Sequence, residues 1–195
     1  MNPYHRRRCR SPGWSAFMAG TVLPRALDGI ALGPRVLELG PGYGASTRPL
    51  AARARSLTVL EYDPLLAARL RAELGSVRVV NGDATSMGFG AGSFSAVVCF
   101  TMLHHLPGAV AQDRLFAEAA RVLLPGGVFA GTDSRPSLRW RLAHLGDICT
   151  PVDPGTLPGR LSAAGFTRIT VDADRRLVRF LAYTPGPEGA AGAIR

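Results

Sequence analysis

One nine-residue run, Val36-Leu-Glu-Leu-Gly-Pro-Gly-Tyr-Gly44, constrains the fold more than any other part of the chain. Its apolar half predicts a buried strand, and its G-x-G-x-G half predicts a sharp turn into a helix. Glycines at these places let the backbone turn sharply and approach a ligand without a Cβ clash. Alone, the turn is also compatible with a nicotinamide or flavin enzyme, or with a tight turn that holds no ligand.

From residue 35 onward, short apolar runs alternate with amphipathic stretches, which is typical of βαβ units and a parallel sheet. The predicted strands span residues 35–39, 57–61, 78–81, 95–100, 127–132, 167–171 and 178–183. The predicted helices span residues 45–54, 64–74, 109–123 and 154–164. Because residues 172–177 are too few for a helical crossover, the last strand must run antiparallel to its predecessor.

The ends of the chain differ from this α/β domain, which we assign to residues 35–183. Residues 1–34 are predicted to form an arm and a lid helix that starts at Ser11 and is interrupted at Pro24. Residues 184–195 are rich in Gly, Ala and Pro, so we expect a disordered tail.

All 23 basic residues are arginines, because the chain contains no lysine. P-loop enzymes and enzymes that form Schiff bases need a lysine, so these classes are excluded. A net charge of +9 allows nucleic-acid binding, but arginines such as Arg53, Arg69, Arg71, Arg114 and Arg121 are spread over several predicted helices. One cluster consists of Arg6, Arg7, Arg8 and Arg10. A solvated terminal arm is favoured for it, and contact with nucleic acid stays open.

The three cysteines, Cys9, Cys99 and Cys149, are too few and too widely spaced for a disulfide framework or a paired metal-ligand motif. We therefore expect reduced thiols and no metal. No apolar run approaches the roughly 20 residues of a membrane span, and no apolar signal segment follows the N-terminal arginines. These features predict a cytoplasmic protein that is not inserted in a membrane, and leave its oligomeric state open.

Three carboxylates accompany the first three predicted strands. Glu38 lies inside the first strand, where a buried carboxylate needs a cation or hydrogen-bond donors. Glu61 ends the second strand, where an acid can accept hydrogen bonds from both hydroxyls of a ribose. Asp83 follows the third strand, at a place suited to an adenine amino group. Ammonium, ribose and adenine are the three polar ends of S-adenosyl-L-methionine.

With these residues in order, the chain resembles a class I S-adenosylmethionine-dependent methyltransferase over residues 35–183. The stretch from Phe94 to Pro107 and the turn from Arg121 to Gly127 are similar to the ubiquinone- and menaquinone-biosynthesis-like subgroup. The resemblance implies a Rossmann-like α/β fold: a seven-stranded sheet in the order 3-2-1-4-5-7-6, strand 7 antiparallel, with helices on both faces. The implied cofactor-binding residues are Glu38, Gly40, Gly42, Gly44, Glu61, Tyr62, Asp83, Ala84 and Phe100.

Methyl transfer from a sulfonium can rest on alignment and exclusion of water, with a general base only where the nucleophile must lose a proton. His104 and His105 follow the fourth strand, and His144 lies in the unassigned segment 133–153. Any of the three could be that base, or the tandem pair could shape a helix start. The expected acceptor-side residues are Trp14, Met18, Arg139, His144 and Asp147. Leu138, Trp140, Leu142 and Leu145 are expected to add an apolar wall.

Absent motifs favour a small-molecule acceptor over nucleic acid. The Asn/Asp-Pro-Pro-Tyr motif of nucleic-acid amino-methyltransferases would follow the fourth strand, where this chain has Phe100-Thr-Met-Leu. The two-glutamate loop of protein arginine methyltransferases is also missing. Two alternatives stay open: an RNA methyltransferase that uses the arginine arm, and a catalytically idle cofactor-binding module that acts through a partner.

Overall fold

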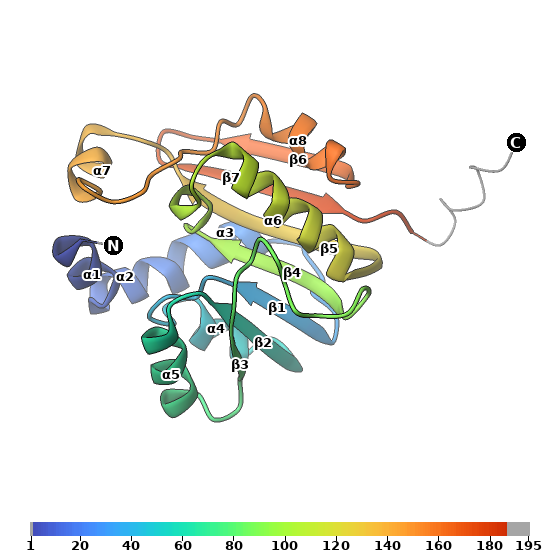
Figure 1. Ribbon diagram of the computed structural model, residues 1–195, viewed down its shortest axis with the longest axis horizontal. Coiled ribbons are helices and arrows are strands. Elements are labelled where there is room, and N and C mark those ends of the chain that lie inside the picture. The colour runs from blue at the N-terminus through green and yellow to red at the C-terminus, as the bar shows by residue number, and fades with distance from the viewer. Residues whose placement is uncertain (1, 187–195) are drawn as a thin grey trace, which may run out of the picture.

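A computed structural model describes residues 2–186, apart from the side chain of Arg139, and its centre is a seven-stranded sheet (Figure 1). The strand order is β3-β2-β1-β4-β5-β7-β6, and β7 runs antiparallel to both neighbours. This confirms the predicted order and the antiparallel last strand. The strands are β1 (Arg35–Leu39), β2 (Ser56–Glu61), β3 (Arg78–Asn81), β4 (Phe94–Phe100), β5 (Leu123–Ser134), β6 (Thr167–Ala173) and β7 (Leu177–Tyr183).

Helices cover both faces of the sheet, as predicted. The helices beside or beyond the strands are α4 (Thr47–Ala51), α5 (Pro64–Glu73), α6 (Ala109–Val122), α7 (Leu138–Ala143) and α8 (Leu157–Ala163). One core contains side chains of α6 and α8, and the other contains side chains of α4, α5 and the N-terminal helices. In β1, Val36 packs into the second core while Leu37 and Leu39 pack into the first. Burial on both faces explains why Val36, Leu37 and Leu39 are all apolar, and Glu38 is the exception among the buried residues of this strand.

Three predicted elements differ from the structure by three or more residues at one end. β5 begins at Leu123 and continues to Ser134, because Phe94 pairs with Leu123 and the antiparallel partner β7 extends the ladder to Ser134. The helix expected at residues 45–54 is shorter because the glycine turn continues through Ala45. The helix expected at 154–164 starts at Leu157, because the Asp153 side chain instead accepts a turn hydrogen bond from Gly155 N.

The N-terminal segment contains more helix than predicted. Asn2 caps an unexpected helix, α1 (Pro3–Cys9), by accepting a hydrogen bond from His5 N at 2.9 Å. Ser11 caps α2 (Pro12–Phe17) as expected. A π-helical turn, η1 (Met18–Val22), then joins α2 directly to α3 (Leu23–Leu27).

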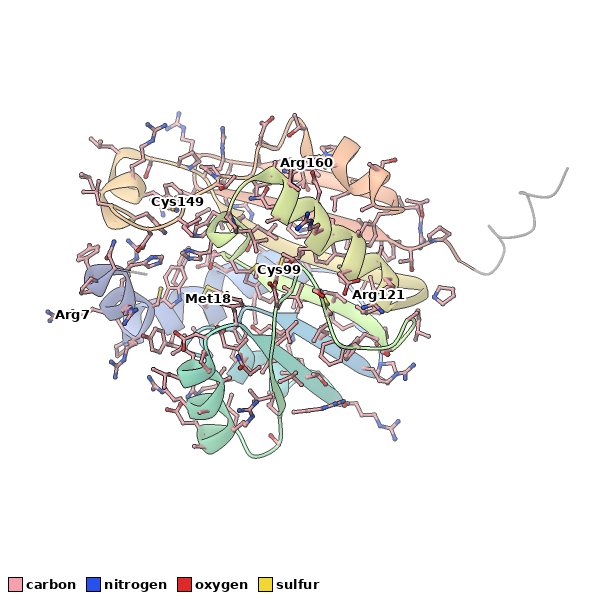
Figure 2. All side chains as sticks on the ribbon, viewed as in Figure 1. Arg7, Met18, Cys99, Arg121, Cys149 and Arg160 are labelled. Atoms are coloured by element: carbon pink, nitrogen blue, oxygen red, sulfur yellow. The ribbon has the colours of Figure 1, made fainter. Side chains whose placement is uncertain are left out.

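Pro24 was expected to break this segment but does not, because it lies in the first turn of α3, where a proline is tolerated. Met18, Val22 and Leu23 are buried in the core, and Figure 2 shows Met18 inside the molecule while Arg7 projects outward from α1. η1 and α3 therefore belong to the core, while the side chains of α2 are less buried. The lid stays a prediction.

Segment 133–153 is partly helical and lies close to α1. Ser137 caps α7, and the loop after α7 returns to the sheet edge, where Thr150 N donates to His104 O at 2.8 Å. At the other end, Asn2 Nδ2 donates to Ala143 O and Leu145 O. Figure 1 shows α1, α2 and α7 at one end of the sheet.

The beginning of the expected disordered tail is ordered. Gly126 N donates to Pro185 O at 2.9 Å, and Thr184 Oγ1 donates to Leu124 O at 2.6 Å. These bonds fix residues 184–186 against the turn before the parallel part of β5. Residues 187–195 lie outside the described residues.

The three cysteines, Cys9, Cys99 and Cys149, are free thiols. None of the helices within residues 2–186 combines the length and apolar character needed to cross a membrane.

Candidate functional site

The glycine turn lies where β1 ends, at the edge of the sheet formed by the carboxyl ends of the parallel strands. Gly40, Gly42 and Gly44 all have positive φ, at 61°, 57° and 77°. A Cβ on Gly40 would lie 2.9 Å from Met102 Cε and 3.2 Å from Met102 Cβ, so a side chain here would require Met102 to shift. A Cβ on Gly42 would meet nothing within 4 Å, so the space in front of the turn is open. A ligand can approach the backbone there.

Glu38 is a buried carboxylate, 1% exposed, just before this turn. Its Oε1 accepts a hydrogen bond from Ser46 Oγ, while Oε2 has no hydrogen-bond partner among the described residues. Burial raises the pKa of Glu38 to about 7, against the opposing effects of the Ser46 and Thr47 hydroxyls. Both hydroxyls are neutral, and no described residue forms an ion pair with Glu38, so the ionised side chain lacks a cation.

Glu61 connects the end of β2 to the glycine turn. One carboxylate oxygen accepts a hydrogen bond from Gly42 N and the other from Asp63 N, both at 2.9 Å. Burial raises the pKa of Glu61, and these two hydrogen bonds oppose the shift. Asn81 Nδ2 donates to Glu61 O at 2.8 Å and so joins the ends of β2 and β3. Asn81 was not predicted as a site residue.

The other predicted cofactor residues lie in contrasting environments. Asp83 is exposed and accepts hydrogen bonds from Thr85 N and Thr85 Oγ1. Tyr62 is 75% exposed beside Glu61. Ala84 and Phe100 are buried in the two cores, at 8% and 5% exposure, so their side chains already have packing partners. Contact of any of them with a cofactor stays a prediction.

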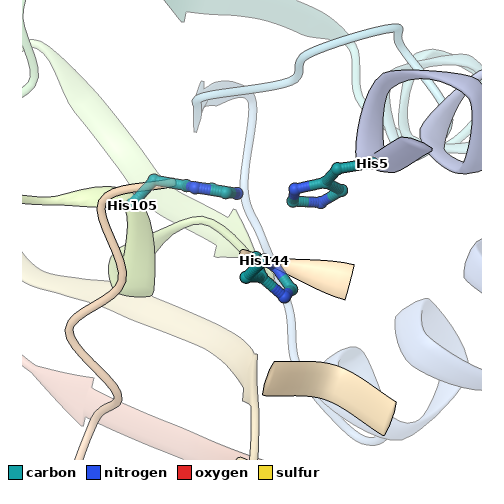
Figure 3. Close-up of side chains that lie close together, drawn as sticks. All are labelled: His5, His105 and His144. Carbon is teal, nitrogen blue, oxygen red and sulfur yellow. The ribbon is translucent and has the colours of Figure 1, made fainter. Parts of the chain in front are cut away.

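All four histidines of the chain, His5, His104, His105 and His144, form one cluster, which we call the histidine cluster. Figure 3 shows three of them converging, with His5 from α1, His105 from the 3-10 turn η2 (Leu103–His105) and His144 from the end of α7. The ring centroids of His5 and His144 are 4.2 Å apart, and those of His5 and His105 are 5.2 Å apart. Burial lowers the pKa of His5 and His144, and it lowers that of His105 to about 2.

His104 and Asp133 form a buried pair at the ends of β4 and β5, with exposures of 2% and 0%. Asp133 accepts a hydrogen bond from His104 N at 3.0 Å and contacts His104 Nδ1 at 2.5 Å. Ser134 N donates to the same carboxylate. Between β4 and His104, Thr101 has a positive φ of 51°, which is rare for a β-branched residue and common at functional sites.

His144 and Asp147, both predicted on the acceptor side, turn inward. The His144 Nδ1 lies 2.7 Å from Trp140 O, and His144 Nε2 is buried without a hydrogen-bond partner in the described part of the chain. Asp147 Oδ2 lies 3.1 Å from His5 Nδ1, and its side chain is 5% exposed. His144 also lines an open cavity of about 300 Å³ together with Trp140 and Cys149.

The other residues predicted on the acceptor side lie in different environments. Met18 is a core residue, 2% exposed. Trp14 packs against Phe17 and lies under the guanidinium of Arg8. The side chain of Arg139 lies outside the described part of the structure. The expected apolar wall is wrong for Leu138, Leu142 and Leu145, which are 76%, 57% and 67% exposed because they lie on the outer side of α7 and its following loop.

Two residues, His5 in the histidine cluster and Asp133 beside it, were not predicted from the sequence. His5 lies near the start of the chain, and no pattern linked it to residues beyond 100. Asp133 was visible only as the first residue of an unassigned segment; its position at the end of a parallel strand was the available signal. A larger open cavity of about 530 Å³, lined in part by Asp113 and Arg160 between α6 and α8, contains none of the predicted site residues.

Comparison with known proteins agrees with this geometry. Residues 37–131 match the family described as a methyltransferase domain. The chain is 34% identical over 177 residues to the ribosomal RNA small subunit methyltransferase A of Bordetella pertussis, covering 74% of this chain and 62% of that protein. It is 37% identical over 108 residues to a fatty-acid O-methyltransferase of Mycolicibacterium smegmatis, covering 53% and 38%. The chain thus spans less than two thirds of either relative.

A solved structure extends the similarity in fold. Phosphoethanolamine N-methyltransferase 2 of Haemonchus contortus, in complex with phosphomonomethylethanolamine and S-adenosylhomocysteine, superposes with a TM-score of 0.68 at 17% identity. The match covers 86% of this chain and 52% of that one. Residues 37–131 are thus similar to a methyltransferase domain, and the seven-stranded sheet has the fold of this solved methyltransferase.

Proposed function

We propose that the chain binds S-adenosylmethionine along the ends of β1, β2 and β3 and transfers its methyl group to a small molecule at the histidine cluster. The observation that carries the proposal is Glu38 Oε2, a buried carboxylate oxygen without a hydrogen-bond partner in residues 2–186, beside an open glycine turn. The ammonium group of the cofactor is the partner that this oxygen lacks.

Each polar end of the cofactor then has its own residue. Glu38 binds the ammonium group, Glu61 accepts hydrogen bonds from the ribose hydroxyls, and Asp83 accepts one from the adenine amino group. Gly40 and Gly42 leave the backbone accessible, and Tyr62 covers the adenine. When bound, S-adenosylmethionine supplies an electrophilic methyl group on a sulfonium.

The protein's contribution to transfer is to hold the acceptor in line with that methyl group and to exclude water. His104, His105 and His144 are the proposed acceptor-side groups, and the imidazole of His104 or His144 can take a proton from a hydroxyl or amine acceptor. The pKa of about 2 makes His105 a poor base, so its proposed role is to line the acceptor side. Asp133 is proposed as a positioning residue, because it fixes the ring of His104. α1 and α2 are the proposed lid, with Trp14 at its inner side.

A small acceptor is supported by the burial of the histidine cluster under α1 and α7, which leaves little access for a macromolecule. The same region, with Phe100-Thr-Met-Leu after β4, supports membership of the ubiquinone- and menaquinone-biosynthesis-like subgroup. The name of the Mycolicibacterium relative, a fatty-acid O-methyltransferase, is compatible with such an acceptor.

RNA is the second candidate acceptor, and two observations favour it. The Bordetella relative, named as a ribosomal RNA methyltransferase, aligns with 74% of this chain. The net charge is +9, and Arg7 projects from α1 near the proposed acceptor side.

Transfer of a labelled methyl group distinguishes these acceptors. The chain would be incubated with methyl-labelled S-adenosylmethionine and either a panel of phenols, carboxylic acids and amines or small-subunit ribosomal RNA. Our proposal expects label in a small molecule, and no loss of that activity when Arg6 and Arg7 are both changed to glutamine. Label in RNA that disappears in the double variant would support the second candidate. Cofactor binding without transfer to either would support the idle module.

A further inference from the structure

We propose that His5, His105 and His144 form a binding site for one divalent transition-metal ion, with Zn²⁺ as the best-fitting ion. The site shares His105 and His144 with the proposed acceptor side, so it deepens the proposed function there. It is separate from the cofactor side, because none of the three histidines belongs to the glycine turn or to the three carboxylates.

The geometry brings three ligand atoms together from three parts of the chain. One ring nitrogen from each histidine lies within 4.8 Å of one from each of the others. In a tetrahedral zinc site with Zn–N bonds of about 2.0–2.1 Å, ligand nitrogens are separated by about 3.3 Å. The three rings would therefore need to approach one another by at most about 1.5 Å, which small side-chain rotations can provide (Figure 3).

Hydrogen bonds to the opposite ring nitrogens orient two of the three rings. His144 Nδ1 lies 2.7 Å from Trp140 O, which leaves the buried Nε2 with no other partner among the described residues. His5 Nδ1 lies 3.1 Å from Asp147 Oδ2, so the carboxylate holds that side of the ring and the other nitrogen is available. Histidine ligands of metal sites are oriented in this way, by a carbonyl or a carboxylate behind the ring.

The donor set selects the kind of ion. Three imidazoles suit Zn²⁺, Co²⁺, Ni²⁺ or Cu²⁺, whereas Mg²⁺ and Ca²⁺ prefer oxygen ligands. Three protein ligands leave the fourth position of a tetrahedral ion open, which is typical of sites that bind water or a substrate atom. Here His144 also lines the cavity of about 300 Å³ with Trp140 and Cys149, so a small molecule can reach that position.

A cluster of neutral aromatic rings is the alternative explanation, and metal titration separates the two. The test uses the chain without a histidine tag, stripped with a chelator, and titrated with Zn²⁺ by calorimetry and with Co²⁺ by visible absorption. We expect one ion per chain and the Co²⁺ bands of a tetrahedral nitrogen site. His5→Ala and His144→Asn should each weaken binding more than the roughly 10- to 100-fold expected for Asp147→Asn, which removes only the carboxylate behind His5.

Cys9→Ser is the matched control, because Cys9 lies on α1 with His5 but is not among the three ligands; its affinity should match the parent chain. Binding of S-adenosylhomocysteine and the circular dichroism spectrum should be retained in the His5 variant, which shows that the chain is folded. Absence of stoichiometric binding, or binding that survives both histidine substitutions, would overturn the proposal. So would loss of binding in Cys149→Ser, because that result would indicate a thiolate site in the same cavity.

Discussion

The two halves of the sheet edge are built in different ways. On the cofactor side, Glu38, the glycine turn and Glu61 lie at the ends of successive strands within one short stretch of sequence. On the acceptor side, the cluster takes His5 from α1, two histidines from η2 and His144 from α7. The first half depends on local order along a parallel sheet and can be read from spacing. The second depends on how α1 and α7 pack together, which spacing does not encode.

The same contrast separates the two buried carboxylates of the site. Both carboxylate oxygens of Asp133 have hydrogen-bond partners, which we call a saturated carboxylate. They contact His104 Nδ1 and accept hydrogen bonds from His104 N and Ser134 N. Glu38 is bonded to Ser46 on one oxygen, and its other oxygen has no partner within the described residues. A saturated carboxylate stabilises the fold, whereas an unsatisfied one costs stability until a ligand supplies the missing partner. The following substitutions test this difference.

Replacing Asp133 should have the largest effect on stability. Asp133→Ala removes the acceptor of two buried donors of His104 and of the half-buried Ser134 N, so the free energy of unfolding should fall by about 3–5 kcal/mol. Urea denaturation measures the loss. Asp133→Asn keeps one acceptor oxygen and should lose less. Asp172→Ala is the control, because that side chain is 57% exposed and its removal should change stability by no more than about 0.5 kcal/mol. If Asp133→Ala and Asp172→Ala lowered the free energy of unfolding equally, the stabilising role of the His104–Asp133 pair would be contradicted.

In the ligand-free chain, Glu38→Gln should raise the free energy of unfolding, which is the opposite of the effect of Asp133→Ala. The pKa of Glu38 is about 7 in the fold and near its ordinary 4.5 when unfolded, so the folded state holds the proton more tightly between these values. Wild-type stability should therefore fall, relative to the variant, as pH rises from 4.5 to 7. The difference reaches up to about 3 kcal/mol above pH 7 and vanishes below pH 4.5.

Thermal or urea unfolding at pH 4.5 and pH 8 provides the measurement. Saturating S-adenosylhomocysteine should stabilise the wild type much more than the variant, because only the carboxylate pairs with the ammonium group. Equal stability of the two chains at both pH values would show that Glu38 is not destabilised by burial.

Glu61→Ala should act mainly on binding. It should also lower stability, by less than Asp133→Ala, because Gly42 N and Asp63 N lose their acceptor. The change leaves two ribose hydroxyls without acceptors, so the affinity for S-adenosylhomocysteine should weaken by about 1–3 kcal/mol. Asp113→Ala is the matched control, since Asp113 is a carboxylate on α6 that pairs with Arg160 of α8, and neither side chain bonds to the glycine turn within the described residues. Calorimetry that gives the two variants the same affinity would remove Glu61 from the site.

The fold was predictable where each element has a local cause. The alternation of apolar runs with amphipathic stretches located every strand, and the short link before β7 determined its direction. α1 was missed because Asn2 and Pro3 were not recognised as a helix start, although an Asn cap before a proline is such a signal. The break expected at Pro24 was wrong because a π-helical turn carries the chain into α3 without interruption.

The candidate site was predictable only where its residues lie at or just after the ends of successive strands. The three carboxylates and the glycine turn were found by their spacing along successive strands. His104 and His105 were found because they follow β4. Their partners were not, because His5 and Asp133 reach the cluster only through the packing of α1 against α7 and the pairing of β5 with β4.

Calorimetric titration of the wild-type chain with S-adenosylhomocysteine, and separately with a nicotinamide dinucleotide, tests the cofactor side most directly. We predict one S-adenosylhomocysteine per chain, bound more tightly at pH 8 than at pH 6, with release of a proton at pH 6 as the ammonium group lowers the pKa of Glu38. We predict no comparable binding of the dinucleotide. Absence of S-adenosylhomocysteine binding, or tighter binding of the dinucleotide, would contradict the assignment of Glu38, the glycine turn and Glu61 to this cofactor.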